Sequence, residues 1–179
     1  MTRAESRLPA GYRVRAYRDD DAAALVRIEN HAAELFRAYG FPEMADNPIP
    51  DVPFFENYIA GQTVWVALDA EDVPAGFTVA GALADWLHLK ELSVDPDHGR
   101  KGLGAALVGI VLAEGRARGF GEVSLTTFRD VPFNRPFYES LGFAVLPLEQ
   151  ASEALRLCFY SEVNSTVDPA RRCLMTRRI

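Results

Sequence analysis

Three glycines and two adjacent cations stand where the sequence predicts the start of an aliphatic helix. This glycine elbow consists of Gly99, Arg100, Lys101, Gly102, Leu103 and Gly104. The first turn of a helix leaves four backbone amides unpaired and carries about half a positive charge, so an anion is stabilised there. Glycines let the backbone approach a ligand closely, and the two cations add charge. We therefore predict that the elbow binds a pyrophosphate group.

Three other interpretations of the elbow lead to different proteins. A P-loop requires GxxxxGK followed by Ser or Thr, and the chain contains no such run. A dinucleotide fingerprint requires a third glycine where Leu107 stands, and no acidic residue closes a following strand at the required distance. A dehydrogenase is therefore the weakest alternative. The third interpretation, in which the glycines only form a tight turn before the helix, stays open.

Polar residues before and after the elbow could transfer protons. His88 and Glu91 lie in the predicted strand that leads to the elbow, and a histidine has the ordinary pKa best suited to a base at neutral pH. Asn134 and Tyr138 are four residues apart in a predicted short helix, so their side chains point the same way. Each residue also has a structural interpretation: solvated strand positions for the first two, a helix cap for Asn134 and core packing for Tyr138. Gly142 is predicted to end the short helix in a left-handed conformation.

Helices and strands are both needed to position these residues. Alternating apolar residues predict strands at 11–17, 63–69, 76–85, 86–95, 122–128, 142–148 and 171–179. Helical patterns follow the acidic run at 19–21 and cover 54–60, 102–118, 134–141 and 152–162. The proline-rich segment 40–53 is predicted to be irregular. This order predicts a single domain over residues 1–179 of the α/β (α+β) class, with a sheet that is antiparallel at its start and parallel around the elbow.

Composition and charge argue against several classes of partner. The 179 residues carry a formal net charge of -6, which argues against general binding of nucleic acid or anionic membranes. The longest apolar stretch, 103–113, is about half of the roughly 20 residues that a membrane span requires. The two cysteines form no disulfide framework pattern, and residues 1–11 lack a basic-then-apolar leader, so we predict a cytoplasmic protein.

Three side chains of types that bind metals or attack substrates are assigned no such role. His31 lies on the first predicted helix and His98 beside the elbow, and both are expected at the surface. Cys158 has no local partner in the sequence, which predicts a buried structural thiol. We therefore expect no metal site.

Two motifs in this chain resemble those of the GCN5-related N-acetyltransferase (GNAT) superfamily. Its motif A reads Gln or Arg, two residues, Gly, one residue, then Gly or Ala, and the elbow matches it with glycine at the first place and the arginine one place later. The elbow follows "ELSVDP", as motif A follows the fourth strand in the family, and "NRPFYESLGF" resembles motif B. The longer stretch "LTTFRDVPFNRPFYESLGF" is similar to a bacterial subgroup of acetyltransferases. The resemblance covers residues 64–146 and implies a mixed, mostly antiparallel sheet with flanking helices, whose fourth and fifth strands splay apart.

The resemblance implies an acyltransferase of the EC 2.3.1 class that uses acetyl-CoA directly, without a covalent enzyme intermediate or a metal. It implies that the pyrophosphate lies on the amides near Arg100 and that the pantetheine arm pairs with the strand before the elbow. The implied cofactor-binding residues are Leu92, Ser93, Val94, Arg100, Lys101, Gly102, Leu103, Gly104, Ala105, Asn134 and Tyr138. Tyr138 would protonate the departing CoA sulfur, and either His88 or Glu91 would be the general base.

The acceptor is the least defined part of the prediction. We expect a primary amine of a small molecule or peptide, bound near a segment rich in aromatic residues, namely Phe36, Tyr39, Phe41, Phe54, Phe55 and Tyr58. The alternative is a catalytically silent module of the same fold that binds or senses acyl-CoA. The oligomeric state, with a homodimer among the options, stays open.

Overall fold

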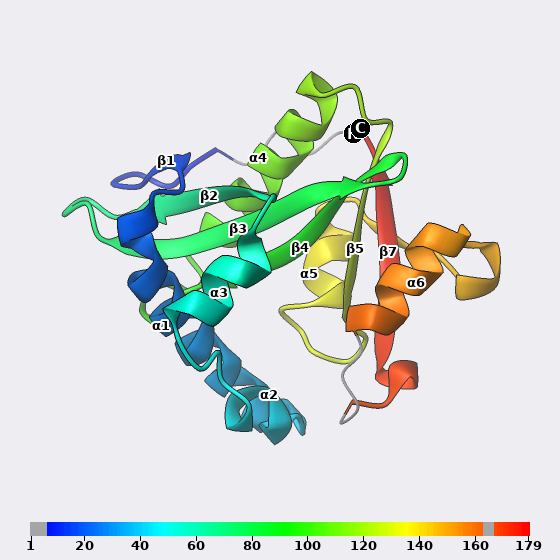
Figure 1. Ribbon diagram of the computed structural model, residues 1–179, viewed down its shortest axis with the longest axis horizontal. Helices are drawn as coiled ribbons and strands as arrows, with labels where there is room; N and C mark the ends of the chain where they lie inside the picture. The colour runs from blue at the N-terminus through cyan, green and yellow to red at the C-terminus, as the bar shows by residue number, and fades with distance from the viewer. Residues whose placement is uncertain (1–6, 163–166) are drawn as a thin grey trace. The chain divides into compact units, whose positions relative to one another are not determined.

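The structure, a computed structural model, describes residues 7–162 and 167–179. Its strands are β1 (Arg13–Ala16), β2 (Thr63–Leu68), β3 (Pro74–Leu83), β4 (Trp86–Val94), β5 (Glu122–Phe128), β6 (Ala144–Val145) and β7 (Arg172–Arg178). Its α-helices are α1 (Ala22–Ala33), α2 (Pro42–Asp46), α3 (Val52–Ile59), α4 (Leu103–Ala117), α5 (Arg135–Ser140) and α6 (Glu153–Glu162) (Figure 1). Short 3-10 helices cover Glu34–Tyr39 after α1 and Pro96–His98 after β4.

The strands form one seven-stranded sheet in the order β1-β2-β3-β4-β5-β7-β6. β4 and β5 pair in parallel, in a register that joins Trp86 to Glu122 and Leu89 to Leu125. The β1–β2, β2–β3, β5–β7 and β6–β7 pairs are antiparallel. The predicted mixed, mostly antiparallel sheet with its parallel pairing at the strand before the elbow is therefore confirmed.

The chain divides into two compact units. The described residues up to Gly81, together with Glu91–Val111, form unit 1. Ala82–Lys90 and Leu112–Ile179 form unit 2. The elbow belongs to unit 1, but the elements on either side of it are shared between the units. β4 begins in unit 2 and ends in unit 1, whereas α4 begins in unit 1 and ends in unit 2.

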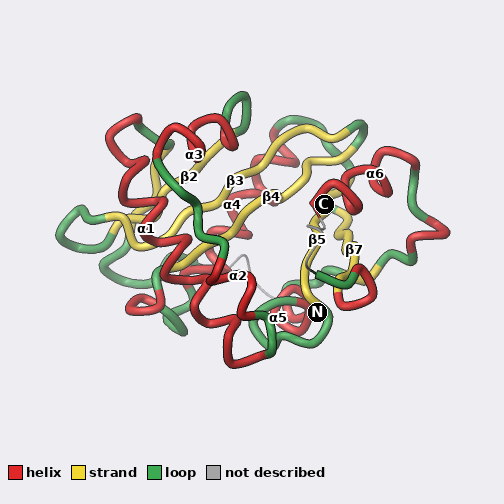
Figure 2. The backbone as a smooth tube through the Cα atoms, turned by 60° about the horizontal axis from the view of Figure 1, so that its bottom comes forward, coloured by secondary structure: helices red, strands yellow, loops and turns green. Residues whose placement is uncertain are grey.

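Two apolar clusters in unit 1 position the elbow. α1 and α3 lie side by side (Figures 1 and 2) and pack against β2 and β3 through Leu25, Ile28, Phe55, Ile59, Val64, Val66, Phe77 and Val79. A second cluster joins the start of α4 to the end of β4 through Leu103, Leu107, Ala67, Ala75, Leu92 and Val94. Val66 and Ala67, neighbours in β2, belong to different clusters, because successive strand residues point to opposite faces. The start of α4 is thus fixed against the last residues of β4.

α6 packs against strands of unit 2. It runs beside β7 in Figures 1 and 2. Leu155 and Phe159 belong to one apolar cluster with Leu174 of β7 and Trp86 of β4. A helix with an apolar stripe at i and i+4 buries that stripe and leaves its other faces to solvent or polar partners. One of the polar faces of α6 carries Cys158 and Glu162, which are described below.

The segment 40–53 is more regular than the sequence predicts. The sequence predicts an irregular segment, but Pro42 occupies the first turn of α2, where its fixed φ and missing N–H are tolerated. Phe41 is fully buried. The Asn30 side chain donates to the Ile49 carbonyl at 3.0 Å and accepts from the Ile49 amide at 2.8 Å, which ties the segment to α1. The strand predicted at 142–148 is shorter in the structure, where only the two residues of β6 are in strand conformation.

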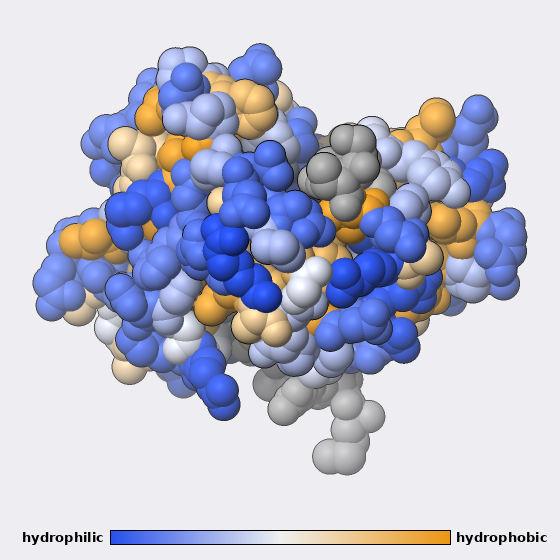
Figure 3. All heavy atoms as spheres, turned by 90° about the horizontal axis from the view of Figure 1, so that it is seen from below, coloured by the Kyte–Doolittle hydropathy of each residue, from blue (hydrophilic) through white to orange (hydrophobic). Residues whose placement is uncertain are grey.

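None of the helices in the described part of the chain combines the length and the apolar character that a membrane span needs. The face in Figure 3 is mostly hydrophilic, with small hydrophobic patches between the polar residues. Large apolar side chains that are exposed include Leu35, Tyr39, Phe54, Leu157 and Tyr160. Three of these five, Leu35, Tyr39 and Phe54, lie in unit 1 near the segment predicted to bind the acceptor.

A buried ion pair at the start of α1 leads to a stability prediction. Asp21, 4% exposed, accepts two hydrogen bonds from Arg15 at 2.6 and 2.7 Å and one from the Arg18 amide at 2.8 Å. The Arg15 hydrogen bonds hold the pKa of Asp21 below its ordinary value of 3.8, although burial opposes this. Because the folded pKa is depressed, the stabilisation is complete above pH 4 or so and is lost as the pH falls further.

We therefore expect Asp21→Asn to lower the free energy of unfolding at pH 7 by about 2–3 kcal/mol. Urea unfolding at pH 7 and pH 3 measures the effect, and the gap between wild type and variant should shrink at the lower pH. Asp20→Asn, at an exposed neighbouring position, is the matched control and should change little. An equal loss in both variants would contradict the assignment.

Candidate active site

The glycine elbow forms the entry to α4, as the sequence predicts. Gly102 has a φ of +87° and Arg100 a φ of +60°, so the chain makes two left-handed steps before the helix begins. A Cβ on Gly102 would meet no atom within 4 Å, so the backbone conformation and not crowding is what favours glycine there. The Gly102 carbonyl accepts from the Ala106 amide at 3.1 Å, and the amides of residues 103–105 precede the first intrahelical bond. The elbow therefore presents a row of backbone donors.

A buried aspartate holds the turn that precedes the elbow. Asp95, 4% exposed, accepts from the Asp97 amide at 3.2 Å, from Arg27 at 2.9 Å and from His31 at 3.1 Å. Burial alone would raise the pKa of Asp95, but these hydrogen bonds and positive neighbours lower it below its ordinary value. Since Arg27 and His31 belong to α1, the aspartate fixes α1 to the turn. Sequence reasoning missed this contact, for which the Asp-Pro turn was the available signal.

The two histidines predicted at the surface both have partners in unit 1. His31 pairs with Asp95, and 44% of its side chain is exposed. His98 lies 2.8 Å, through Nδ1, from the Tyr12 hydroxyl, and the two rings meet edge to face. Both contacts tie down the turn that precedes the elbow.

Two carboxyl groups of unit 1 influence one another. Glu91 on β4 accepts, through one oxygen, from the Leu92 amide and the Ser93 hydroxyl, each at 3.1 Å. Glu29 on α1 is half-buried, and burial followed by the negative charge of Glu91 raises the pKa of Glu29 to about 8. Glu29 can therefore gain or lose a proton close to neutral pH. Sequence reasoning named Glu91 and missed Glu29, whose signal was an acidic residue next to buried Ile28 on the apolar side of a helix.

Asn134 directly precedes α5 and Tyr138 lies on it, both in unit 2. Tyr138 is 8% exposed, and its ring contacts Phe137 and Phe143 edge to face. Asn134 occupies the N-cap position, but of the two roles that the sequence leaves open for it the helix cap is not formed, because its side chain makes no capping hydrogen bond. Instead its Nδ2 donates to Thr127 Oγ1 at 2.9 Å. The Asn134 Oδ1 atom is buried and has no hydrogen-bond partner among the described residues, so it can accept from a ligand.

The end of α5 agrees with the sequence. Gly142 has a φ of +86°, in the left-handed region, and its amide donates to the Glu139 carbonyl at 3.0 Å. The Phe143 amide then donates to the Tyr138 carbonyl at 3.1 Å. This closes the last turn in the manner of a glycine-terminated helix. The predicted structural role of Gly142 is confirmed, and the turn places Phe143 against the Tyr138 ring.

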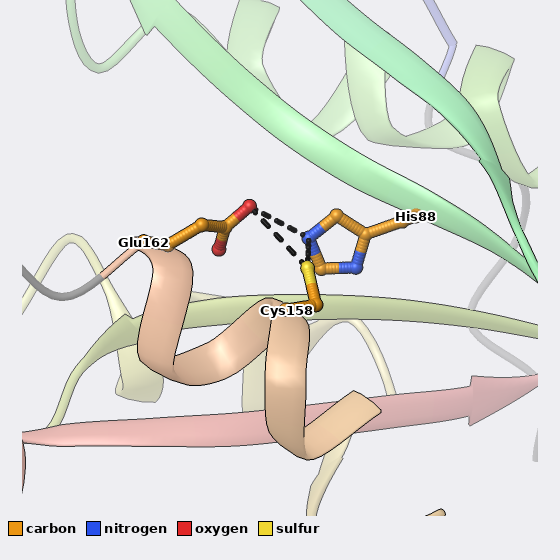
Figure 4. A group of neighbouring side chains, drawn as sticks. All are labelled: His88, Cys158 and Glu162. Atoms are coloured by element: carbon orange, nitrogen blue, oxygen red, sulfur yellow. Dashed lines mark hydrogen bonds and ion pairs between the residues drawn. The ribbon is translucent and has the colours of Figure 1, made fainter. Parts of the chain in front are cut away.

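His88 lies in a polar cluster of unit 2 (Figure 4). The imidazole, 6% exposed, contacts Ser124 Oγ through Nδ1 at 2.9 Å and Glu162 Oε1 through Nε2 at 3.1 Å. Cys158 Sγ is 3.5 Å from the same Nε2 atom and 3.7 Å from Glu162 Oε1. Cys158, predicted to be a buried structural thiol without a local partner, is only half-buried and contacts both His88 and Glu162. The contact with His88 could not be read from the sequence because the two residues lie 70 positions apart, whereas Glu162 is only four residues from Cys158.

Electrostatics in this cluster differ for the acid and the thiol. Burial raises the pKa of Cys158 to about 12, and the charge of Glu162 and its hydrogen bond act in the same direction. Burial alone would raise the pKa of Glu162 as well, but the hydrogen bond and charge of His88, and then Thr126, lower it below its ordinary value. Glu162 is thus an anion at neutral pH and Cys158 a neutral thiol.

The predicted site residues are divided between the units. The elbow, Leu92, Ser93, Val94 and Glu91 belong to unit 1, together with Glu29. Asn134, Tyr138 and the His88 cluster belong to unit 2. Leu92 and Val94 pack into the cluster below α4, whereas the Ser93 hydroxyl donates to Glu91. The structure therefore brings together the elbow with the end of β4, and Glu29 with Glu91.

Comparison with known proteins gives a family match. Residues 25–143, more than half of the 179, match the model of the acetyltransferase (GNAT) family. A GCN5-related N-acetyltransferase from Rhodopseudomonas palustris is similar in structure, with a TM-score of 0.71, 19% identity, and coverage of 97% of this chain and 99% of that one.

Two further solved structures share the fold. The PaiA N-acetyltransferase of Thermoplasma acidophilum, solved with coenzyme A, has a TM-score of 0.70 and 15% identity over 94% of this chain and 99% of that one. The ribosomal-protein-S18-alanine N-acetyltransferase of Escherichia coli has a TM-score of 0.67 and 21% identity over 94% of each chain. At these identities the likeness concerns the fold.

Proposed function

The chain belongs to the GNAT acetyltransferase family, and we propose that it transfers an acetyl group from acetyl-CoA to a primary amine of a small molecule or peptide. The family uses acetyl-CoA as its acyl donor. The observation that carries the proposal is the elbow, in which Gly102 at a φ of +87° leads directly into the first turn of α4. Backbone amides and the cations Arg100 and Lys101 at a helix start are suited to a diphosphate.

Contacts along the CoA molecule follow from the proposal. The diphosphate would lie on the amides of residues 103–105, and the pantetheine arm would pair with the backbone of Leu92–Val94 as an added strand does. Asn134 Oδ1, buried and without a partner among the described residues, would accept from an amide N–H of that arm. This acceptor would otherwise be a buried polar atom left unsatisfied, which costs stability in a protein interior.

Acyl transfer needs a neutral amine, a donor to the oxyanion and a proton for the thiolate. The amine nitrogen attacks the thioester carbonyl carbon, and a backbone amide near Leu92–Val94 stabilises the oxyanion. As the carbon–sulfur bond breaks, the Tyr138 hydroxyl protonates the CoA thiolate. The pair of Glu29 and Glu91 takes the proton that the amine loses, because a carboxyl pKa of about 8 is better matched to an ammonium than an ordinary carboxylate.

Of the two positions that the sequence suggested, the proposal favours Glu91 over His88, with Glu91 raising the pKa of Glu29 and Glu29 taking the proton. Both ring nitrogens of His88 have partners, Ser124 on one side and Glu162 with Cys158 on the other. Glu91, by contrast, acts together with a second carboxyl group whose pKa lies near neutral pH. Two neighbouring carboxyl groups also attract a cationic amine, which supports an amine as the acceptor.

Titration calorimetry with coenzyme A tests the elbow. We expect saturable binding of one molecule per chain, and about tenfold weaker binding by Gly102→Ala, because a Cβ disfavours the left-handed backbone that directs the amides. Gly119→Ala is a matched control: Gly119 has a φ of +79° and equally open surroundings, but it lies at the far end of α4. No saturable heat with folded wild-type protein would overturn the proposal.

The acceptor is sought by measuring thiol release from acetyl-CoA with panels of polyamines, amino acids, aminoglycosides and peptide N-termini. We expect turnover with at least one class of primary amine. CoA binding without turnover on any panel would favour the silent acyl-CoA module over the enzyme. The two measurements therefore separate the binding function from the catalytic one.

A further inference from the structure

A cluster of three potential metal ligands in unit 2 has no part in the proposed acetyl transfer. His88 Nε2, Cys158 Sγ and Glu162 Oε1 each offer one donor atom, and these atoms lie within 4.8 Å of one another. Figure 4 shows the three side chains converging on one point, from β4 and from two successive turns of α6. We propose that His88, Cys158 and Glu162 bind one zinc ion.

The spacing of the donors fits a tetrahedral zinc ion. Zinc bonds of about 2.0–2.1 Å to nitrogen and oxygen and about 2.3 Å to sulfur place tetrahedral ligands about 3.3–3.4 Å apart for the nitrogen–oxygen pair. The same bond lengths give about 3.5–3.6 Å for each pair that includes sulfur. The observed separations are 3.1 Å from His88 to Glu162, 3.5 Å from His88 to Cys158 and 3.7 Å from Cys158 to Glu162. Each lies within roughly 0.3 Å of the tetrahedral value.

The sequence places two of the ligands correctly for a metal. Cys158 and Glu162 are four residues apart on α6, so their side chains leave the same face of the helix one turn apart. His88 is supplied by β4, which crosses that face. A site built from one helix and one strand joins them, so the zinc ion would tie α6 to β4 within unit 2.

A second layer of hydrogen bonds orients the ligands. Ser124 Oγ lies 2.9 Å from His88 Nδ1, and when Nδ1 carries the proton, the lone pair of Nε2 is directed at the cluster. The other carboxylate oxygen of Glu162 accepts from Thr126 Oγ1 at 2.5 Å, and Thr126 in turn accepts from Arg172 at 2.6 Å. Partners of this kind fix the orientation of metal-binding histidines and carboxylates.

The donor set determines which metal the site takes. A thiolate, an imidazole and a carboxylate form the mixed sulfur, nitrogen and oxygen set that zinc accepts, whereas Mg²⁺ and Ca²⁺ prefer oxygen alone. On binding, the Cys158 thiol releases its proton to solvent and forms the zinc–sulfur bond. Three described ligands leave one tetrahedral position, which a water molecule would take.

The second cluster of ligand types in the described chain lacks these features. His31, Asp95 and Asp97 also lie close together in unit 1. Arg27, however, donates to Asp95 at 2.9 Å and places a positive charge beside that carboxylate. A cation is repelled there, and the aspartate already has the partners that fix the turn before the elbow.

Metal titration of the full chain tests the zinc site. Protein freed of metal by a chelator is titrated with ZnCl₂, with CoCl₂ as a spectroscopic substitute and with MgCl₂ as the control ion. We expect one equivalent of zinc, no response to magnesium, and with cobalt a thiolate-to-metal charge-transfer band. At a zinc concentration about a hundred times the Kd, the Tm should rise by roughly 5–10 °C.

Variants assign the ligands. Cys158→Ser should remove the cobalt charge-transfer band and weaken zinc binding by more than about a hundredfold. Glu162→Gln should weaken zinc binding to the same extent, and Ser124→Ala should weaken it by about tenfold. Cys173→Ser, which removes the other thiol, and Glu153→Gln, on the first turn of the same helix, are matched controls that should bind as wild type does.

Two results would overturn the proposal. One is the absence of zinc binding by wild-type protein that circular dichroism shows to be folded. The other is zinc binding that persists unchanged in both Cys158→Ser and Glu162→Gln. The wild-type titration gives a decision even if a variant fails to fold, and neither measurement depends on acetyl transfer.

Discussion

Replacing Tyr138 with phenylalanine should lower kcat for acetyl transfer by about 100-fold or more and leave the Kd for coenzyme A within about twofold. A positioned general acid contributes about 10²–10⁴-fold, and this variant removes the hydroxyl that protonates the departing thiolate. The ring of Tyr138, 8% exposed, packs against Phe137 and Phe143, and phenylalanine keeps those contacts. Thiol release at saturating amine measures kcat, and calorimetry measures the Kd.

A second tyrosine provides the control for this result. Tyr160 is 56% exposed on α6, so Tyr160→Phe removes a hydroxyl at no proposed catalytic position and should leave kcat unchanged. Equal kcat values for wild type and Tyr138→Phe across several amines would remove the tyrosine from the mechanism. A parallel loss of CoA affinity and kcat would assign Tyr138 to binding instead.

The second large effect concerns the carboxyl pair. With Glu29 at a pKa of about 8, kcat/KM should rise with pH through that value as the group becomes able to accept a proton. Glu29→Gln should lose this rise and lower kcat/KM above pH 8 by about 100-fold. Glu91→Gln should move the rise to lower pH, because the negative charge of Glu91 is one of the two causes that raise the pKa of Glu29.

Profiles of kcat/KM against pH from about 6 to 9.5 distinguish the candidate bases. Glu56→Gln, an exposed position on α3, is the control and should keep the wild-type profile. If the rise disappears in His88→Gln and persists in Glu29→Gln, the base is His88. If all variants keep it, the rise belongs to the amine substrate and the carboxyl pair has no catalytic role.

The parts of the fold that could be predicted from the sequence are those that depend on patterns of residues close together in the chain. The elbow is one, because Gly102 and the aliphatic run after it specify a left-handed step and a helix within a few residues. Period-two alternation likewise located the strands, and the order of the motifs predicted the parallel β4–β5 pairing. The helix at 42–46 was missed because a proline both ends and begins helices, and the sequence does not say which.

Residues of the candidate site could be predicted from the sequence only where a residue type has one common structural or chemical role. Contacts between residues far apart in the chain could not be predicted. Cys158 contacts His88, 70 positions away, and the negative charge of Glu91 on β4 raises the pKa of Glu29 on α1. Asn134 stands where asparagine usually caps a helix, yet its Nδ2 donates to Thr127 and its Oδ1 has no hydrogen-bond partner among the described residues. Tertiary partners decided these cases, and they are not encoded in local spacing.

Asp95 has a mechanical consequence for unit 1. One turn of α1 carries Arg27, Glu29 and His31, and the first and last of these are bound by the aspartate that precedes the elbow. Sliding or rotation of α1 must therefore break the hydrogen bonds that Arg27 and His31 make to Asp95 in the turn before the elbow. By thermodynamic reciprocity, if a ligand at the elbow changes the affinity of a second ligand for the turn bearing Glu29, the second ligand changes the affinity of the first by the same factor.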